Sequence, residues 1–138
     1  MATTPWTAFA APDGNGTSCT VVAVQLRLRT PDAAPTVDTW VRRVTRALPA
    51  PGLLGFMTQR TEQHLRTVSA WQRRAAMAAF EREAPHRDAK HALHELLHPP
   101  TVAVWTEATA ALPPDWQDVR RRLNQAADRQ HSTRPAQD

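Results

Sequence analysis

The sequence predicts a single α+β domain with the ferredoxin-like βαββαβ order and one extra helix at its C-terminal end. Three observations predict it: alternating apolar residues mark strands, apolar residues at helical spacing mark helices, and prolines or glycines separate these segments. The 138 residues suit one domain with tails. We expect residues 1–18 to form a flexible arm, residues 19–127 the domain, and residues 128–138 a disordered tail.

The first strand is predicted over residues 20–29, where Val22 and Val24 alternate with Val21 and Ala23. A Thr-Pro pair ends this strand. Thr36 then offers an N-cap for a helix whose apolar residues recur at helical spacing until a Pro-Gly segment stops it. In the arm before the strand, the large apolar residues Trp6 and Phe9 predict docking on the domain or on a partner subunit.

The middle of the chain predicts a hairpin followed by two helical segments. Strands are expected at about 53–60 and 65–71, joined by a short polar connection. An alanine-rich helix follows, and Pro85 separates it from a second helical segment over residues 86–98.

A strand over residues 101–106 and a helix that Asp115 caps complete the order. In this topology the helices cover one face of the sheet and leave the other bare. The bare face would carry Val21 and Ala23, so we expect a partner chain to cover it in a homodimer.

The charge pattern does not favour nucleic-acid binding, although the formal net charge is +4. Sixteen Arg and one Lys are spread along the chain, and the run Arg120-Arg121-Arg122 lies beside Asp118, as on a solvated helix face. The lone Cys19 fits a reducing compartment. The N-terminal residues lack the features of a signal peptide, and no apolar stretch reaches membrane-spanning length, so we expect a cytoplasmic protein.

The run VSAWQRRAAMAAFEREAPHRDAKHALHELLH resembles the strand-to-helix segment of antibiotic-biosynthesis-monooxygenase-like proteins, and more closely a bacterial branch akin to spheroidene monooxygenase. That branch shows Ser-x-Trp at the end of the third strand, an aromatic residue about nine positions later and a histidine about fifteen positions later. Here these are Ser69, Trp71, Phe80 and His86. APGLLGFMTQR and PPDWQDVRRRL resemble two further segments, so the resemblance covers roughly residues 20–125.

The resemblance implies a dimeric α+β barrel with one substrate pocket per subunit, between sheet and helices. Related proteins include cofactor-independent oxygenases of polyketide aromatics, haem-degrading enzymes, a haem-dependent carotenoid oxygenase and polyketide cyclases. The chain departs from the branch on the first strand, where Gln25 or Arg27 stands in place of Asn. It also has Leu97 or His98 near a position where the branch has Trp or Phe.

Candidate site residues follow from this pattern and from their chemistry. Trp71 can stack on a flat substrate, and Arg27 or Gln25 can bind or polarise it. His86 can act as a general base or, with haem, as the axial ligand, so the expected cofactor is none or haem. The expected pocket is lined by Phe80, Met77 and Ser69.

Structural interpretations compete with these roles. A Trp at a strand end can be core, and a His after Pro85 can cap a helix. His91, His94 and His98 would share one helix face, but three residues on a straight helix rarely converge on one ion, so we expect no metal.

The sequence thus predicts a small-molecule monooxygenase-like enzyme acting on an apolar aromatic or polyene substrate. Two alternatives stay open: a cofactor-free cyclase or lyase of polyketide type, and a non-catalytic dimeric ligand-binding protein. Phosphate-binding loops, serine nucleophile elbows and paired catalytic carboxylates are absent from the sequence, which argues against kinases, hydrolases and dehydrogenases.

Overall fold

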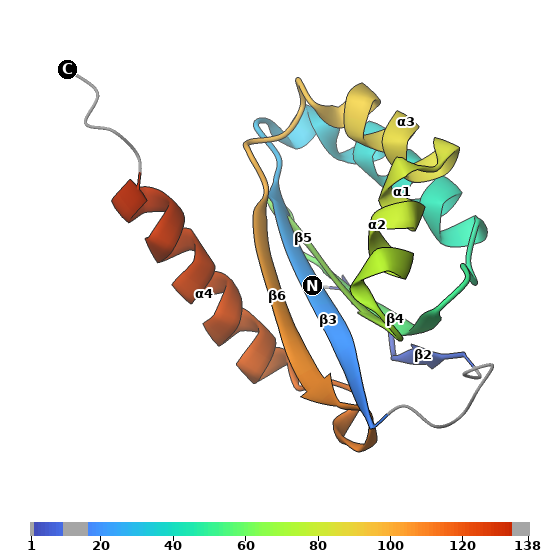
Figure 1. The fold of residues 1–138 in the computed structure, drawn as a ribbon. Coiled ribbons are helices and arrows are strands. Elements are labelled where there is room, and N and C mark those ends of the chain that lie inside the picture. The colour runs from blue at the N-terminus through green and yellow to red at the C-terminus, as the bar shows by residue number, and fades with distance from the viewer. Residues whose placement is uncertain (1, 10–16, 134–138) are drawn as a thin grey trace.

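The computed structural model describes residues 2–9 and 17–133 as one antiparallel sheet with helices on both faces (Figure 1). Four long strands lie in the order β4-β5-β3-β6, the ferredoxin-like order that the sequence predicted. Their bounds are β3 Ser18–Arg27, β4 Leu53–Arg60, β5 His64–Trp71 and β6 Thr101–Ala108.

The central strand β3 is buried on both of its faces. It pairs with β5 on one side and with β6 on the other, and all of these ladders are antiparallel. Val22 is 4% exposed on one face, and Val21 is fully buried on the other. A strand that is apolar on both faces needs a covering layer on each, because otherwise its side chains would face water.

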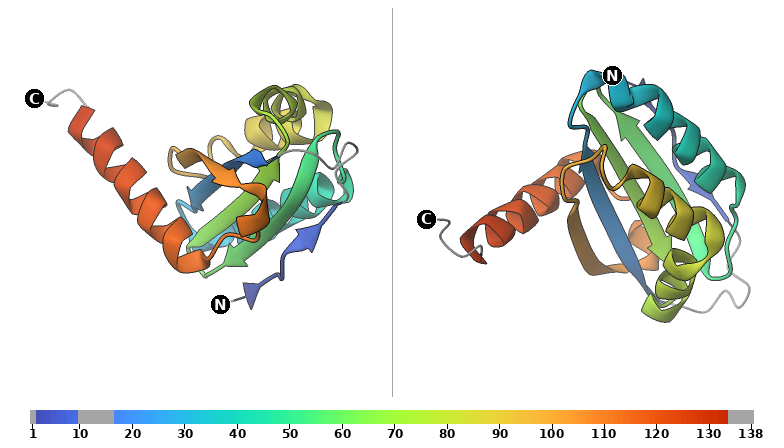
Figure 2. Two further views of the ribbon diagram at one scale, coloured as in Figure 1. Left: turned by 60° about the horizontal axis from the view of Figure 1, so that its bottom comes forward. Right: turned by 90° about the horizontal axis from the view of Figure 1, so that it is seen from above.

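Three helices cover the face that carries Val22 (Figure 2). Their bounds are α1 Ala34–Arg46, α2 Arg74–Arg82 and α3 Ala84–Leu93. The prediction that Thr36 caps α1 was wrong, because the 3-10 turn η1, Pro31–Ala33, runs directly into the helix at Ala34. Val37 is fully buried in the core beneath α1, as the helical spacing predicted.

The opposite face is covered by the last helix, α4, Trp116–Thr133 (Figure 1). Val119 and Leu123 of α4 pack into one core cluster with Val21 and Ala23 of β3. The reason given for expecting a dimer, that a partner must cover these two residues, was therefore wrong. The chain covers them with its own helix, which a 3-10 turn η2, Thr109–Ala111, connects to β6.

The N-terminal residues 2–9 lie along the edge of the sheet. The short strands β1, Ala2–Thr3, and β2, Thr7–Ala8, both pair antiparallel with β4. Between them, Trp6 packs onto the core cluster below α4, so it docks on the domain as one of the two alternatives predicted. This part of the expected flexible arm is ordered, because its backbone hydrogen bonds are made to β4; residues 10–16 lie outside the described residues.

Several predicted boundaries shift. The first strand runs over Ser18–Arg27 instead of 20–29, and β6 extends two residues beyond the predicted 101–106. The second helical segment stops at Leu93 instead of 98. Helix α4 continues into the predicted disordered tail as far as Thr133, while residues 134–138 lie outside the described residues. Among the helices that the structure describes, none is long and apolar enough to cross a membrane.

Gly55 leaves the space in which Trp6 lies. A Cβ atom on Gly55 would overlap the indole ring of Trp6, so the substitution Gly55→Ala forces the N-terminal segment to shift. We expect a loss of about 1–3 kcal/mol in the free energy of unfolding, typical of overpacking. Urea unfolding followed by circular dichroism measures it. In a Trp6→Ala background, Gly55→Ala should lower the free energy of unfolding by less. Equal losses in both backgrounds would contradict the contact between Gly55 and Trp6.

Candidate functional site

The end of strand β5 holds Trp71 against the helical layer. Its side chain is 2% exposed, and its indole Nε1 donates a hydrogen bond to the Ser69 Oγ at 2.9 Å. The two residues lie on the same face because side chains alternate along a strand. The hydroxyl therefore satisfies the one polar group of a buried indole, which fixes the orientation of the ring.

Phe80 and His86 extend this contact from the sheet into the helices. The Trp71 and Phe80 ring centroids are 5.5 Å apart, and the Phe80 and His86 centroids are 5.7 Å apart in an edge-on arrangement. Helix α2 ends where Glu83 is extended, and α3 begins directly afterwards with Pro85 in its first turn. This break turns the chain so that a residue of each helix reaches the same ring cluster.

Ser69, Trp71, Phe80 and His86, which the family resemblance grouped, thus form one continuous series of contacts. Met77 of α2 is half-buried beside the same core cluster. We call these five residues the aromatic site. Whether they carry out catalysis stays a prediction.

The imidazole of His86 is the unusual polar group of the aromatic site. Its Nδ1 atom is buried, and no hydrogen-bond partner lies within reach among the described residues. Burial lowers the pKa of His86 from its ordinary value of 6.5, an effect that the Glu81 carboxylate partly opposes. The ring is therefore neutral at pH 7, the form that can accept a proton.

An exposed apolar strip lies beside the aromatic site on the same face of the sheet. Val102 and Val104 of β6 are 43% and 36% exposed, which is high for a central segment of a strand. The register places Val104, Val22 and Ser69 in one row across β6, β3 and β5. Strands are spaced by about 4.8 Å, so the strip begins about 10 Å from the Ser69 side chain.

Gln25 and Arg27 lie on the opposite face of the sheet from the aromatic site. In β3 they share the face of Val21 and Ala23, which α4 covers in part. The sheet separates Gln25 and Arg27 from His86, and a role of either residue in binding or polarising a substrate stays a prediction. Neighbouring residues of a strand point to opposite faces of the sheet, so Val24 and Gln25 lie on different faces.

A polar cluster that the sequence did not reveal surrounds Gln25. The Arg66 Nε atom donates to the Gln25 Oε1 at 2.7 Å, and Arg66 Nη1 donates to the Gln59 Oε1 at 2.8 Å. Gln59 is the buried polar residue of the described chain, at 3% exposure. The pairing of Gln25 with Arg66 and of Arg66 with Gln59 across three strands brings them together. The sequence does not give the register between strands, and only that register shows that Gln25, Arg66 and Gln59 are neighbours.

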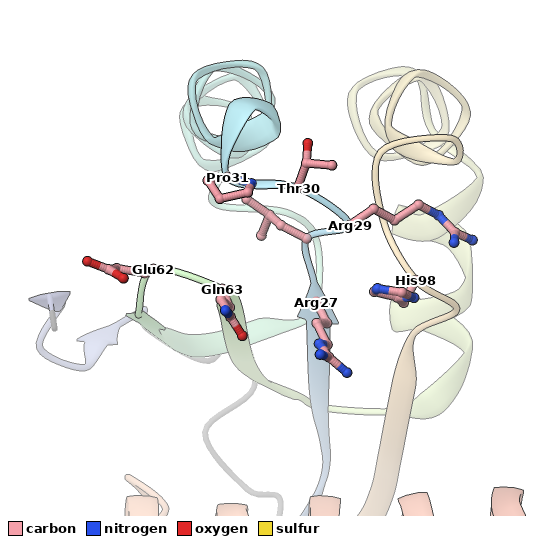
Figure 3. A pocket seen from close by; sticks show the side chains of 8 residues that line it. Arg27, Arg29, Thr30, Pro31, Glu62, Gln63 and His98 are labelled. Atoms are coloured by element: carbon pink, nitrogen blue, oxygen red, sulfur yellow. The ribbon is translucent and has the colours of Figure 1, made fainter.

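Two of the surface hollows in the described part of the chain lie away from the aromatic site. One, of about 80 Å³, lies at the end of β3 between Arg27, Arg29 and His98 (Figure 3). There the Arg29 Nε donates to the Leu97 carbonyl at 3.1 Å. The other, of about 500 Å³, lies beside Trp40 and His91. Neither of these two hollows is lined by residues of the aromatic site.

The three histidines after His86 do not share a helix face. His91 is helical, but α3 ends at Leu93, and His98 lies in the segment before β6. The predicted shared face was therefore wrong. No group of three metal-ligating side chains is found among the described residues.

Haem does not fit the surroundings of His86. An axial histidine needs an open slot beside its ring for the flat macrocycle. Here the ring lies against Phe80, and neither hollow reaches it.

The lowered pKa of His86 predicts a pH-dependent stability. The unfolded chain binds a proton at about pH 6.5 and the folded chain only at lower pH, so the free energy of unfolding falls as the pH drops below 6.5. The substitution His86→Gln should make this fall shallower. Part of the pH dependence of the unfolding free energy should remain in this variant, because burial also lowers the pKa of His64.

Urea unfolding at a series of pH values between 7.5 and 5, a range chosen around about pH 6.5, measures the slope. The exposed His91 of α3 offers the matched control, and His91→Gln should follow the wild type. An unchanged slope in His86→Gln would show that His86 is not held neutral by the fold.

Comparison with solved structures gives matches of fold at low identity. A structure described as an antibiotic biosynthesis monooxygenase matches with a TM-score of 0.55 and 18% identity over 62% of this chain and 95% of its own. A dimeric ferredoxin-like protein of unknown function from Thermobifida fusca matches with a TM-score of 0.53 and 16% identity, over 64% of this chain and 92% of its own. A protein of unknown function from Nitrosomonas europaea matches with a TM-score of 0.59 and 16% identity, over 73% of this chain and all of its own.

No protein-family model and no curated protein matches the chain. The structural matches confirm the predicted fold, and at such low identities they show the fold alone. The chain therefore shares the α+β fold of antibiotic-biosynthesis-monooxygenase-like, dimeric ferredoxin-like proteins.

Proposed function

We propose that this chain is a small-molecule monooxygenase-like enzyme that acts on an apolar aromatic or polyene substrate. The observation that carries the proposal is the aromatic site. There a neutral histidine, whose Nδ1 has no hydrogen-bond partner among the described residues, lies edge-on against Phe80, and the Phe80 ring is tilted against that of Trp71. Solved structures of the same fold include one described as an antibiotic biosynthesis monooxygenase, which supports the same class.

The substrate would lie between the valine strip of β6 and the helices. Val102 and Val104 give an apolar surface that water now contacts, so covering it with an apolar ring is favourable. From there a flat molecule reaches the row of Ser69, next to the Trp71 ring. The half-buried Val24 continues the same apolar surface toward β5.

The chemistry needs no cofactor when the substrate itself reduces oxygen. Neutral His86 would take a proton from an acidic C–H or O–H group, leaving a substrate anion. The anion gives electrons to O₂, one oxygen atom enters the ring, and the other leaves as water. An anthrone is a suitable probe, because its oxidation to an anthraquinone consumes one O₂ and releases one water.

We also propose that the protein acts as a homodimer. One matching structure is that of a dimeric protein of the same fold, and β6 leaves one edge of the sheet unpaired within the described residues. Sedimentation velocity is expected to show one species of twice the mass of the chain. A single species of the monomer mass at micromolar concentration would contradict this proposal.

Oxygen uptake with an anthrone tests the proposed activity. We expect uptake above the rate without protein, reduced about a hundredfold or more in His86→Gln, as is typical when a general base is removed. The rate should also fall in acid, because the protonated imidazole cannot accept a proton; the fall should be centred below the ordinary imidazole pKa of 6.5, because burial lowers the pKa of His86.

The variant His91→Gln, changed on the exposed part of α3, is the control and should keep the wild-type rate. An equal rate in His86→Gln would show that His86 is not the base. Conversion that continues at the same rate without oxygen would instead favour the cyclase or lyase class.

A further inference from the structure

Arg66 is held in a fixed position by two glutamines on the face of the sheet that α4 covers. Its Nε and one hydrogen of Nη1 bond to the side-chain oxygens of Gln25 and Gln59. The two glutamines stand on the strands that flank β5, so the guanidinium is clamped from both sides. A side chain fixed in this way loses little further freedom when it binds a ligand.

Among the described residues, the guanidinium of Arg66 makes its hydrogen bonds through Nε and Nη1 and none through Nη2, so donors remain for a ligand. Nη2 and the second hydrogen of Nη1 are two parallel N–H donors, which match the two oxygens of a carboxylate. Each glutamine uses its oxygen on Arg66, and its remaining side-chain group is an NH₂ donor. The cluster therefore has many donors and few free acceptors.

The surroundings of Arg66 are positively charged. Burial lowers the pKa of Arg66, and the charge of Arg120 on α4 lowers it further. Burial also lowers the pKa of His64, and the charges of Arg66 and Arg27 add to that effect. Arg27 extends away from Thr30 and Pro31 at the end of β3 (Figure 3). The ion pairs among the described residues use the carboxylates of Asp38, Asp88 and Asp118, and none of them includes Arg66.

We propose that Arg66, clamped by Gln25 and Gln59 and flanked by Arg27 and Arg120, is a binding site for the carboxylate group of a small molecule. A half-buried arginine without an acidic partner is costly, and an anion would offset that cost. The site lies on the opposite face of the sheet from the aromatic site. It goes beyond the proposed function and does not depend on it.

Benzoate is the test probe, because it carries one carboxylate on a small apolar ring. At constant ionic strength, benzoate should raise the Tm of the wild type in a saturable way, as a ligand that binds only the folded state does. In Arg66→Gln we expect the apparent affinity to fall at least tenfold. Arg120→Gln removes one charge and leaves the clamp intact, so its affinity should fall severalfold.

His64 provides a second readout that does not depend on stability. A bound carboxylate adds negative charge beside Arg27 and Arg66, so the pKa of His64 should rise when benzoate is added. Titration of the imidazole proton signals by NMR measures this rise. The rise should be absent in Arg66→Gln and present in His86→Gln, because His86 lies on the other face.

Arg46→Gln, an exposed change on α1, is the matched control for net charge. Equal benzoate affinity in Arg66→Gln, Arg46→Gln and wild type would overturn the proposal. Two results together would also overturn it: no saturable binding of benzoate to the wild type, and a shift from dimer to monomer in Arg66→Gln. These results would assign the polar cluster to a subunit contact. Inorganic phosphate in place of benzoate should bind more weakly; tighter binding would overturn the preference for a planar carboxylate.

Discussion

Burial of both faces of β3 is the constraint on which the rest of the structure depends. Val21 is fully buried and its neighbour Val22 is 4% exposed, so neither face of the central strand contacts solvent here. Helices α1, α2 and α3 cover one face, and α4 covers the other. The last helix is therefore an integral layer of the domain, and the chain forms three layers instead of the two that the ferredoxin-like order requires.

A sheet with a layer on each side gives the protein two chemically different environments. On one side, aromatic rings lie beside a neutral imidazole, and exposed valines continue the apolar surface. On the other side, a clamped guanidinium lies among further positive charges. The two environments are separated by a single sheet, so a ligand in one does not contact the residues of the other. Each can therefore change in sequence without altering the other directly.

The fold could be predicted from the sequence because its strands and helices follow local patterns, and the residues of the aromatic site were grouped by the family resemblance of one short stretch of chain. The strand over residues 53–60 has the predicted bounds, and Ser69, Trp71, Phe80 and His86 are in contact. The clamp could not be predicted, because Arg66 meets its glutamines only through the register of three strands. The place of Gln25 and Arg27 on the far face followed from their alternation, but the covering by α4 depends on tertiary packing. The cap predicted at Thr36 failed for a similar reason, since a preceding 3-10 turn decides where α1 begins.

The pairing of the N-terminal residues with β4 also bears on how copies of this protein meet in solution. An unpaired strand edge offers backbone N–H and C=O groups to any other extended chain, which is a common route to aggregation. Here β1 and β2 occupy that edge, and Trp6, seated over Gly55, holds them in place. Residues 2–9 therefore cover the β4 edge of the sheet. Among the described strands they leave β6 as the open edge, and so restrict edge-to-edge association to one side of the sheet.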